Sequence, residues 1–210
     1  MHKYIIMGPQ GCGKGTQAKL LAKKLDLTLI TVGDIFRWNI KNHTKVAARI
    51  KRIVDSGNLV PDEMVNQIVS KRLDEHDWNY GFILDGFPRS EVQAKFFLEN
   101  YDVNGVIYID VPDEVVMNRA LARRHCSKCG LDYNLIHKPP TVDGVCDACE
   151  GALVSRSDDK EEILSNRLEH FNLHTKPTLS LFSKKELVIK VDGQGKLDDV
   201  QIAICKGLGL

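Results

Sequence analysis

The sequence has no long hydrophobic run and almost no net charge. No apolar stretch approaches the roughly 20 residues that a membrane-spanning helix needs. Its 29 Lys and Arg residues are balanced by 28 Asp and Glu residues, which leaves a net charge of +1. This balance excludes a global basic field of the kind that draws proteins onto nucleic acid or acidic membranes. We therefore expect no nucleic-acid or membrane partner, and any anion must be bound by a local cluster of Arg and Lys.

Export signals, internal repeats and flexible linkers are also lacking. Gly8 and Pro9 end the first apolar run too early for a secretory signal. We therefore expect a cytoplasmic location, where disulfides are rare. The 210 residues, 43% of them apolar, are enough for one substantial core with an inserted unit. Six cysteines in such a chain require another explanation.

Near-continuous apolar runs alternate with helical patterns along most of the chain. Such runs are typical of parallel strands covered on both faces, and they occur at residues 3–7, 27–31, 82–84, 106–109 and 187–191. The alternation predicts an α/β fold with a doubly wound, parallel, five-stranded sheet. Helices are expected to begin near four residues that suit a cap or a first turn, namely Asp34, Asp62, Ser90 and Asp113.

Two stretches break this alternation. Residues 35–73 have a helical pattern with no strand, whereas residues 126–153 are rich in Gly, Pro, Cys and Asp. We interpret both as insertions over the core, one of them helical and the other a small unit held together by a metal.

A glycine-rich stretch, GPQGCGKGT, follows the first apolar run and precedes a helical pattern. Gly8 and Gly13-Lys14 have the spacing of a phosphate-binding loop, in which backbone N–H groups approach phosphate oxygens closely. The next helix adds its positive N-terminal end, and Lys14 adds a mobile charge. The alternative is a glycine turn that binds nothing. Gly15 stands where Ser or Thr is usual after the lysine, and Thr16 follows it.

Four cysteines form two tight pairs, Cys126-x-x-Cys129 and Cys146-x-x-Cys149, with sixteen residues between them. This spacing predicts a tetrahedral Zn²⁺ site, and four thiolate ligands leave no open position, so the metal is expected to be structural. Two disulfides are one alternative. A zinc ribbon that binds nucleic acid is another, although few aromatics and mixed charge argue against it. Cys12 and Cys205 lie outside the pattern. We expect Cys205 in the core and Cys12 to be a spectator within the loop, with sensitivity to thiol reagents as the alternative.

The loop variant GxxGxGKGT resembles that of the adenylate kinases and related nucleoside monophosphate kinases. Other segments resemble the same family, in the family's order: VGDIFR (32–37), GNLVPDEMV (57–65), GFILDGFPRS (81–90) with Gln93, RALARRH (119–125) and SRSDDKEEILSNRL (155–168). The resemblance implies a P-loop core at 1–31, 61–124 and 156–210. It also implies a helical monophosphate-binding insert at 32–60, extending at most to about 73, and a zinc-binding lid at 125–155. A monomer is expected.

The resemblance also implies roles for individual residues. Those implied for ATP are Gly11, Cys12, Gly13, Lys14, Gly15, Thr16, Arg119, Arg123, Asp132, Tyr133 and Gly195. Those implied for AMP are Val32, Arg37, Asn58, Leu59, Val60, Gly86, Phe87, Pro88, Arg89, Gln93, Arg156 and Arg167. The expected catalytic set is Lys14, Arg89, Arg123, Arg156, Arg167, Asp85, Asp158 and Asp159. Arginine suits such a site because its planar fork meets phosphate oxygens two at a time.

Several of these residues have a structural alternative. Asp85 ends a predicted strand, where it could hold the water shell of Mg²⁺, or it could cap a helix or turn. Asp158 and Asp159 precede a long helix and could cap it instead of lying beside phosphates. Tyr133 could stack on adenine or simply pack.

The acceptor base is the weakest point of the prediction. The family usually has threonine before Gly33-Asp34, where this chain has Val32, which cannot make a hydroxyl hydrogen bond. The expected reaction is MgATP + AMP ⇌ 2 ADP, because the long lid resembles that of adenylate kinases. The alternatives are a kinase for UMP/CMP or GMP and, further away, a zinc-ribbon NTPase or nucleic-acid-binding protein.

Overall fold

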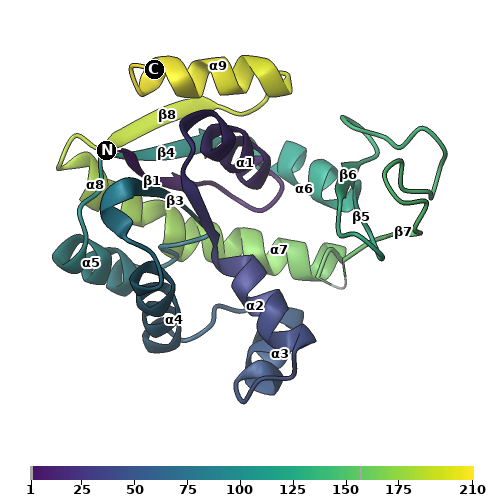
Figure 1. Cartoon of the computed structure of the whole chain (residues 1–210), viewed down its shortest axis with the longest axis horizontal. Helices are drawn as coiled ribbons and strands as arrows, with labels where there is room; N and C mark the ends of the chain where they lie inside the picture. Colours follow the sequence, from purple (N-terminus) through teal and green to yellow (C-terminus); the bar gives the residue numbers. More distant parts are fainter. Residues whose placement is uncertain (1, 157) are drawn as a thin grey trace.

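The computed structural model describes residues 2–156 and 158–210 and has a parallel sheet at its centre (Figure 1). Its strands are β1 (His2–Met7), β2 (Thr28–Thr31), β3 (Gly81–Asp85), β4 (Gly105–Asp110) and β8 (Val188–Asp192). They lie side by side in the order β2-β3-β1-β4-β8, and every neighbouring pair is parallel. The predicted five-stranded parallel sheet is confirmed, and each strand is within about a residue or two of its predicted position.

The near-continuous apolar strands arise because both faces of the sheet are covered. Ile5 on β1 lies in one hydrophobic core, and its neighbour Ile6 lies in the other, as expected when successive side chains point to opposite faces. The two cores therefore lie on opposite sides of one sheet. β1 is paired on both edges, since Ile5 is opposite both Leu84 and Val106.

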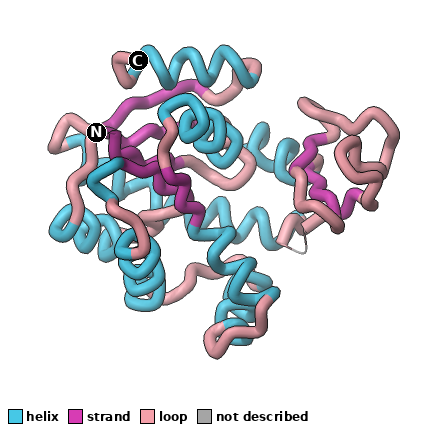
Figure 2. Tube along the Cα trace, viewed as in Figure 1, coloured by secondary structure: helices cyan, strands magenta, loops and turns pink. Residues whose placement is uncertain are grey.

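Helices form a layer over each core, which is the doubly wound arrangement (Figure 2). The first core receives buried side chains from α4 (Asp62–Asp74), α5 (Glu91–Asn100) and α8 (Leu179–Ser183). The second receives them from α1 (Lys14–Leu25), α6 (Asp113–Leu121) and α9 (Leu197–Gly207). A short 3-10 turn (Trp78–Tyr80) precedes β3. α7 (Glu161–His170) continues through a π turn (Phe171–Thr175) and a 3-10 turn (Lys176–Thr178) into α8.

The predicted helix starts agree with the structure. Ser90 is the N-cap of α5, and its hydroxyl accepts a hydrogen bond from the Gln93 N–H. Asp62 and Asp113 are the first residues of α4 and α6, and Asp34 lies in the first turn of α2 (Val32–Lys41). Carboxylates in these positions complement the positive end of each helix.

Two units extend from the sheet. α2 and α3 (Ala47–Asp55) follow β2 and project away from the core in Figure 1. A second unit at the other side of the molecule contains β5 (Arg123–Cys126), β6 (Asp132–Asn134) and β7 (Leu153–Val154), an antiparallel sheet in the order β6-β5-β7. Within residues 2–156 and 158–210, no helix combines the length and apolar character needed to cross a bilayer.

Candidate active site and cysteine cluster

The glycine-rich loop connects the central strand β1 to helix α1 and leaves an open space in front of the helix. Gly11 and Gly13 have φ values of 93° and 95°, a region that side chains other than glycine's rarely adopt. A Cβ added to Gly11 would lie 2.6 Å from the Val116 carbonyl oxygen, whereas one on Gly13 would meet no atom within 4 Å. Gly13 caps α1 without a side chain. The first N–H groups of the helix can therefore reach an anion in that space.

Lys14 and Asp85 face this loop. The Lys14 ammonium donates to the Pro9 carbonyl at 3.0 Å, so the side chain is folded over the loop. Asp85 ends β3 and is 5% exposed, and its Oδ1 has no hydrogen-bond partner. Burial raises the pKa of Asp85, against the opposing effects of Lys14 and Arg89. A Cβ on Gly15 would lie 3.4 Å from Asp85 Oδ2.

The next helix, α5, is capped by Ser90 and not by Asp85, so the helix-cap alternative for Asp85 is wrong. A buried carboxylate oxygen without a partner, beside a lysine and a glycine loop, fits the outer shell of a hydrated Mg²⁺ ion.

Five of the six predicted arginines are close enough to affect one another electrostatically. The pKa of Arg89 is lowered to about 10, first by burial and then by the positive charges of Arg167 and Arg37. Burial also lowers the pKa of Arg156, together with Arg123 and Arg37. Guanidinium groups that disfavour each other's charge favour an added anion. The cluster is thus suited to phosphate groups, and it lies beside Asp85 and the loop.

Asp158 and Asp159 pair with two of these arginines. Asp159 accepts from Arg123 Nε at 2.8 Å and also from Arg123 Nη2. Asp158 accepts from Arg167 Nη1 at 2.6 Å. Burial works against ionisation of Asp158, but Arg167 holds its pKa below the ordinary value. The N-cap of α7 is Lys160, so the capping alternative for the two aspartates is wrong.

Gln10, in the glycine loop, belongs to the same network and was not predicted from the sequence. Its amide Nε2 donates to Asp159 Oδ1 at 2.9 Å, and its Oε1 accepts from Arg167 Nη1. The only signal in the sequence was a long polar side chain within a loop of small residues.

Among the residues predicted for AMP, Gln93 has an amide that is held at both ends by the protein. Its Oε1 accepts from the Arg89 backbone N–H at 2.8 Å, and its Nε2 donates to Asp62 Oδ1 at 2.8 Å. The side chain is 1% exposed. The predicted contact of Gln93 with a base edge stays a prediction, and it would require exchange of one of these bonds. Arg89 Nε donates to the Gly86 carbonyl at 2.9 Å, which fixes the guanidinium beside that segment.

The other residues predicted for AMP divide into buried and exposed groups. Val32 is 1% exposed as the first residue of α2, and Phe87, before a cis bond to Pro88, and Val60 are buried in the same core. Asn58 is exposed, and its Oδ1 lies 3.2 Å from His170 Nε2. Leu59 is half-buried between Asn58 and Val60. Arg37 pairs with Asp34 in the same helix.

Among the residues predicted for ATP, Arg119 lies against the loop that contains Gly195. Arg119 donates from Nη1 to the Gly193 carbonyl at 2.8 Å and from Nη2 to the Gln194 carbonyl at 3.3 Å. Thr16 is exposed in the first turn of α1. Asp132 pairs with Arg156 at 2.7 Å and with Lys19 of α1 at 3.3 Å, so it connects the lid to the core.

Two residues of the predicted ATP set are buried. The Tyr133 ring is 3% exposed, and its hydroxyl donates to Cys146 Sγ and accepts from the Asp147 N–H at 2.8 Å. Its ring presents no face to a base, so the structure favours the packing alternative over stacking on adenine. Cys12 is 2% exposed, and burial raises the pKa of its thiol. Burial and a raised pKa both disfavour reaction of a thiol, which supports the expected spectator role of Cys12 over sensitivity to thiol reagents.

The four paired cysteines converge in the second unit. Their sulfur atoms all lie within 4.8 Å of one another, with Cys126 and Cys149 3.4 Å apart and Cys129 and Cys146 3.6 Å apart. These separations suit four ligands around one ion, since tetrahedral Zn–S bonds of about 2.3 Å put sulfurs just under 4 Å apart. The cysteines are free thiols, so the disulfide alternative is wrong.

The backbone supports this cluster. The N–H groups of Lys128 and Cys129 each donate to Cys126 Sγ at 3.4 Å, which favours a thiolate there. A Cβ on Gly151 would lie 2.8 Å from the same sulfur, so glycine leaves the space that the cluster needs. The site can hold a metal ion. Cys205, expected in the core, is buried on α9.

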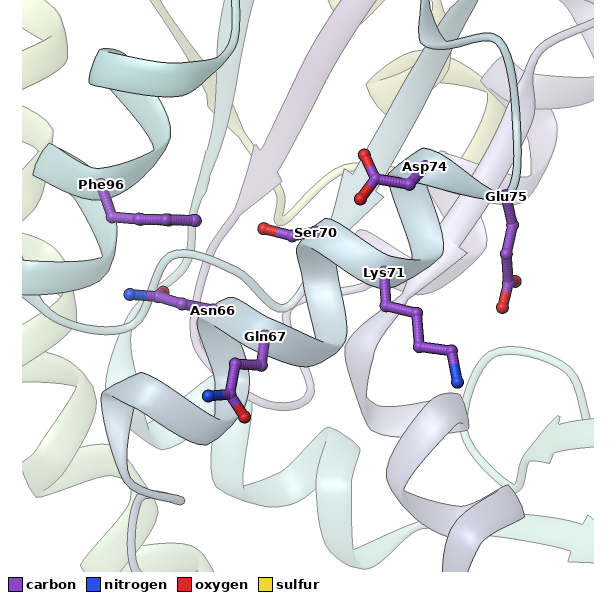
Figure 3. Close-up of a pocket in the computed structure, with 7 residues that line it drawn as sticks. All are labelled: Asn66, Gln67, Ser70, Lys71, Asp74, Glu75 and Phe96. Carbon is purple, nitrogen blue, oxygen red and sulfur yellow. The ribbon is translucent and has the colours of Figure 1, made fainter.

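A groove of about 530 Å³ lies away from all of these residues, between α4 and α5 (Figure 3). It is lined by Asn66, Gln67, Ser70, Lys71, Asp74, Glu75 and Phe96. None of them belongs to the predicted site. The groove is open, unlike the enclosed clefts that usually bury most of a small molecule.

A strand–loop–helix cradle that faces mutually repelling arginines defines a P-loop protein built to bind several phosphates at once. Comparison with known proteins identifies the family within this class. The family model described as adenylate kinase matches residues 6–187. The chain belongs to the adenylate kinase family, whose members are nucleoside monophosphate kinases.

Similar proteins cover the whole chain. An adenylate kinase of Caldicellulosiruptor bescii is 41% identical over 213 residues, which is 99% of each chain. One of Lachnospira eligens is 43% identical over 212 residues, 99% of this chain and 100% of its own. One of Thermotoga neapolitana is 42% identical over 215 residues, 100% of this chain and 98% of its own. The family resemblance inferred from the motifs is confirmed.

Proposed function

We propose that the chain transfers the terminal phosphoryl group of MgATP to AMP, reversibly forming two ADP. One observation carries this proposal: the arginines gather beside the glycine loop, where the charges of their neighbours help to lower the pKa of Arg89 and Arg156. A protein that only hydrolysed a nucleotide would need positive charge for one set of phosphates. This cluster has enough positive charge for the phosphates of two nucleotides.

The loop and Lys14 would bind the phosphates of ATP. Backbone N–H groups of residues 11–16 would surround the phosphate oxygens in the open space before α1. Lys14 would leave the Pro9 carbonyl and move its ammonium to the terminal phosphates, where charge develops during transfer. Most of the catalytic effect would come from positioning and charge stabilisation, because phosphoryl transfer needs little covalent work from the protein.

The arginines would divide between the two nucleotides. Arg37 and Arg89 would hold the monophosphate, and Arg119 and Arg123 the triphosphate. Arg156 and Arg167 would face the group in transfer. Asp158 and Asp159 keep Arg167 and Arg123 in place before nucleotide binds. Phosphate oxygens would then share or replace these carboxylates as partners.

Two metals fit residues of the chain. Asp85, with its unpartnered buried oxygen, would hold the water shell of a Mg²⁺ ion that arrives with ATP. When bound, Mg²⁺ would neutralise part of the charge on the phosphates during transfer. The four clustered thiols fit one structural Zn²⁺, which would hold together a lid whose buried cluster is small.

The domain boundaries belong to this proposal as well. A core at 1–31, 61–124 and 156–210 would carry the loop and Asp85, with the helical insert at 32–60 over AMP and the lid at 125–155 over ATP. β5, which begins at Arg123, would then pass from core to lid. Closing of the lid would exclude water and so suppress hydrolysis of ATP.

An acceptor panel tests the proposal directly. The protein with MgATP is offered AMP, GMP, CMP or UMP, and ADP formation is followed. We expect AMP to be the preferred acceptor and little ATP hydrolysis without an acceptor. Preference for a pyrimidine monophosphate would identify a different kinase, and acceptor-independent hydrolysis would contradict phosphoryl transfer altogether.

Val32 is the position at which base selection can be examined. It replaces the usual threonine, and it is buried at the start of α2. In the same panel, Val32→Thr should increase the preference for AMP by restoring a hydroxyl worth about 0.5–1.5 kcal/mol. An unchanged acceptor profile would show that the base is not read there.

A further inference from the structure

We propose that Gln10 is a positioning residue for phosphoryl transfer, acting through Arg167 and Asp159. This inference rests on the proposed function, because it names a further residue of the same site. Gln10 lies within the glycine loop, two residues after Gly8. Its side chain contacts Asp159 and Arg167, which are 149 and 157 positions away in the sequence.

The amide of Gln10 uses both of its polar ends. As a donor, it contacts Asp159 Oδ1 at 2.9 Å, and as an acceptor it receives the Arg167 Nη1 hydrogen bond. Only a side chain with a donor and an acceptor on one rigid group can satisfy a carboxylate and a guanidinium together. The Asp159 side chain is 1% exposed and that of Arg167 is 16% exposed, so these bonds are shielded from competing water.

Each partner of Gln10 is tied to another element. Asp159 also holds Arg123 at the start of β5, which fixes the guanidinium at the base of the lid. Arg167 also donates to Asp158 and, through Nη2, to the Val54 carbonyl of α3 at 3.1 Å. Gln10 is thus the point at which the phosphate loop is joined to the arginine near the lid and to the arginine that contacts the helical insert.

The orientation of the Arg167 guanidinium depends on this set of hydrogen bonds. Its Nη1 is shared between Gln10 and Asp158, while its Nη2 is held by the insert. Without Gln10, the side chain would be aimed only by Asp158 and by an element that we expect to move. A guanidinium misplaced by about 1 Å in a preorganised site loses much of its effect on the transition state. The affinity for either nucleotide would change little, because each nucleotide would have many other contacts.

Gln10→Met is the informative substitution, since it keeps the length of the side chain and removes both polar ends. The matched control is Gln201→Met, which makes the same chemical change on α9, far from the loop. We expect Gln10→Met to lower kcat roughly five- to tenfold, the effect of losing hydrogen bonds to charged groups. KM for ATP and for AMP should stay within about twofold of the original protein, and Tm should be unchanged in both variants.

A double-mutant cycle with Arg167→Lys identifies the path of the effect. Lysine keeps the positive charge but cannot make the fixed two-pronged contacts of arginine. If Gln10 acts through Arg167, Gln10→Met should have little further effect on kcat once Arg167 has been replaced.

Three results would overturn the inference. Unchanged kcat in Gln10→Met would show that the contacts have no role, and a higher KM for ATP with unchanged kcat would place Gln10 in direct contact with the nucleotide. Losses that simply multiply in the double mutant would exclude action through Arg167. Failure of the original protein to form ADP from ATP and AMP is a separate outcome that contradicts the proposed function.

Discussion

The side chain of Lys14 rests on the carbonyl of Pro9 within its own loop, 3.0 Å away, and is half-buried there. Its ammonium therefore needs no distant partner to be held near the open space before α1. Lys14→Met keeps the length of the side chain and removes the charge. We expect it to lower kcat about 10²–10³-fold or more, because a charge aimed at the transferring group is lost.

Lys23→Met, an exposed position near the end of the same helix, is the matched control for that loss. It should leave ADP formation unchanged. Both variants should keep the Tm of the original protein. Near-normal transfer by Lys14→Met would contradict the assignment of the loop as a phosphate cradle.

Asp85 gives a pH-dependent prediction. Burial raises its folded-state pKa above the ordinary value of 3.8, so the folded state loses stability as pH rises through the interval between the two values. Asp85→Asn removes that loss. At pH 7.5, without Mg²⁺ or nucleotide, we expect a gain of roughly 1 kcal/mol and a Tm higher by about 2–4 °C. The gain should shrink as pH falls toward 3.8 and disappear below about pH 3, where aspartate is protonated in both states.

Thermal unfolding at several pH values measures this difference. Asp74→Asn, at an exposed position on α4, is the control and should show no comparable gain. The same Asp85→Asn variant should need more Mg²⁺ for half-maximal transfer. A variant less stable than the original protein at neutral pH would show that Asp85 makes a stabilising contact in its ionised form.

Single residues differ in how far the sequence could predict them. Gly13 and Lys14 were predictable because the loop motif is local and its spacing alone carries the chemistry. Gln10 was not, since both of its partners are about 150 residues away and only the fold brings them together. For Tyr133 the sequence left two alternatives open, because a tyrosine near a lid tip has the same local pattern whether it packs inward, as it does here, or stands exposed.

At the level of elements, the strands could be predicted closely because burial on both faces makes them continuously apolar. β4, for example, is buried at five of its six residues. The short lid strands were not resolved from the sequence, because β7 has two residues and β6 has three. Their position is set by the cysteine cluster and not by β propensity. Cys126 belongs both to β5 and to the cluster.

The lid should therefore lose its structure when the cluster is broken. Cys146→Ser removes a fully buried ligand position. We expect the protein as purified to hold about one equivalent of Zn²⁺ and the variant to hold substantially less. Limited proteolysis should then cut within residues 126–153 while the core fragment persists, because the small lid has little other core.

Cys205→Ser is the control, since Cys205 lies on α9 outside the cluster. It should retain the metal and the resistance of the lid to proteolysis. Metal-free original protein with four reactive lid thiols would contradict a structural metal. A Cys146→Ser lid that resists protease without metal would show that side-chain packing alone holds it.

The arrangement of the whole molecule was predictable as a class of fold, but the strand order was not. Alternating strands and helices indicated a doubly wound sheet, and the order β2-β3-β1-β4-β8 came from the structure. That order places the loop after the central strand, between neighbours whose carboxyl ends carry Asp85 and Asp110. Ligands bind at such a point in open α/β sheets because the connections on either side diverge there.

The pairing of β1 with a strand on each edge determines how the protein unfolds. Amide protons of β1 are bonded within the sheet centre, with β3 on one edge and β4 on the other, so in D₂O they should exchange only through global opening of the chain. Lid amides should exchange earlier, through local opening. If β1 exchanged as fast as the lid, the sheet centre would not be the most protected part. On warming, the lid can open and close many times while the cradle stays intact, and the cradle is lost only in one step with the whole fold.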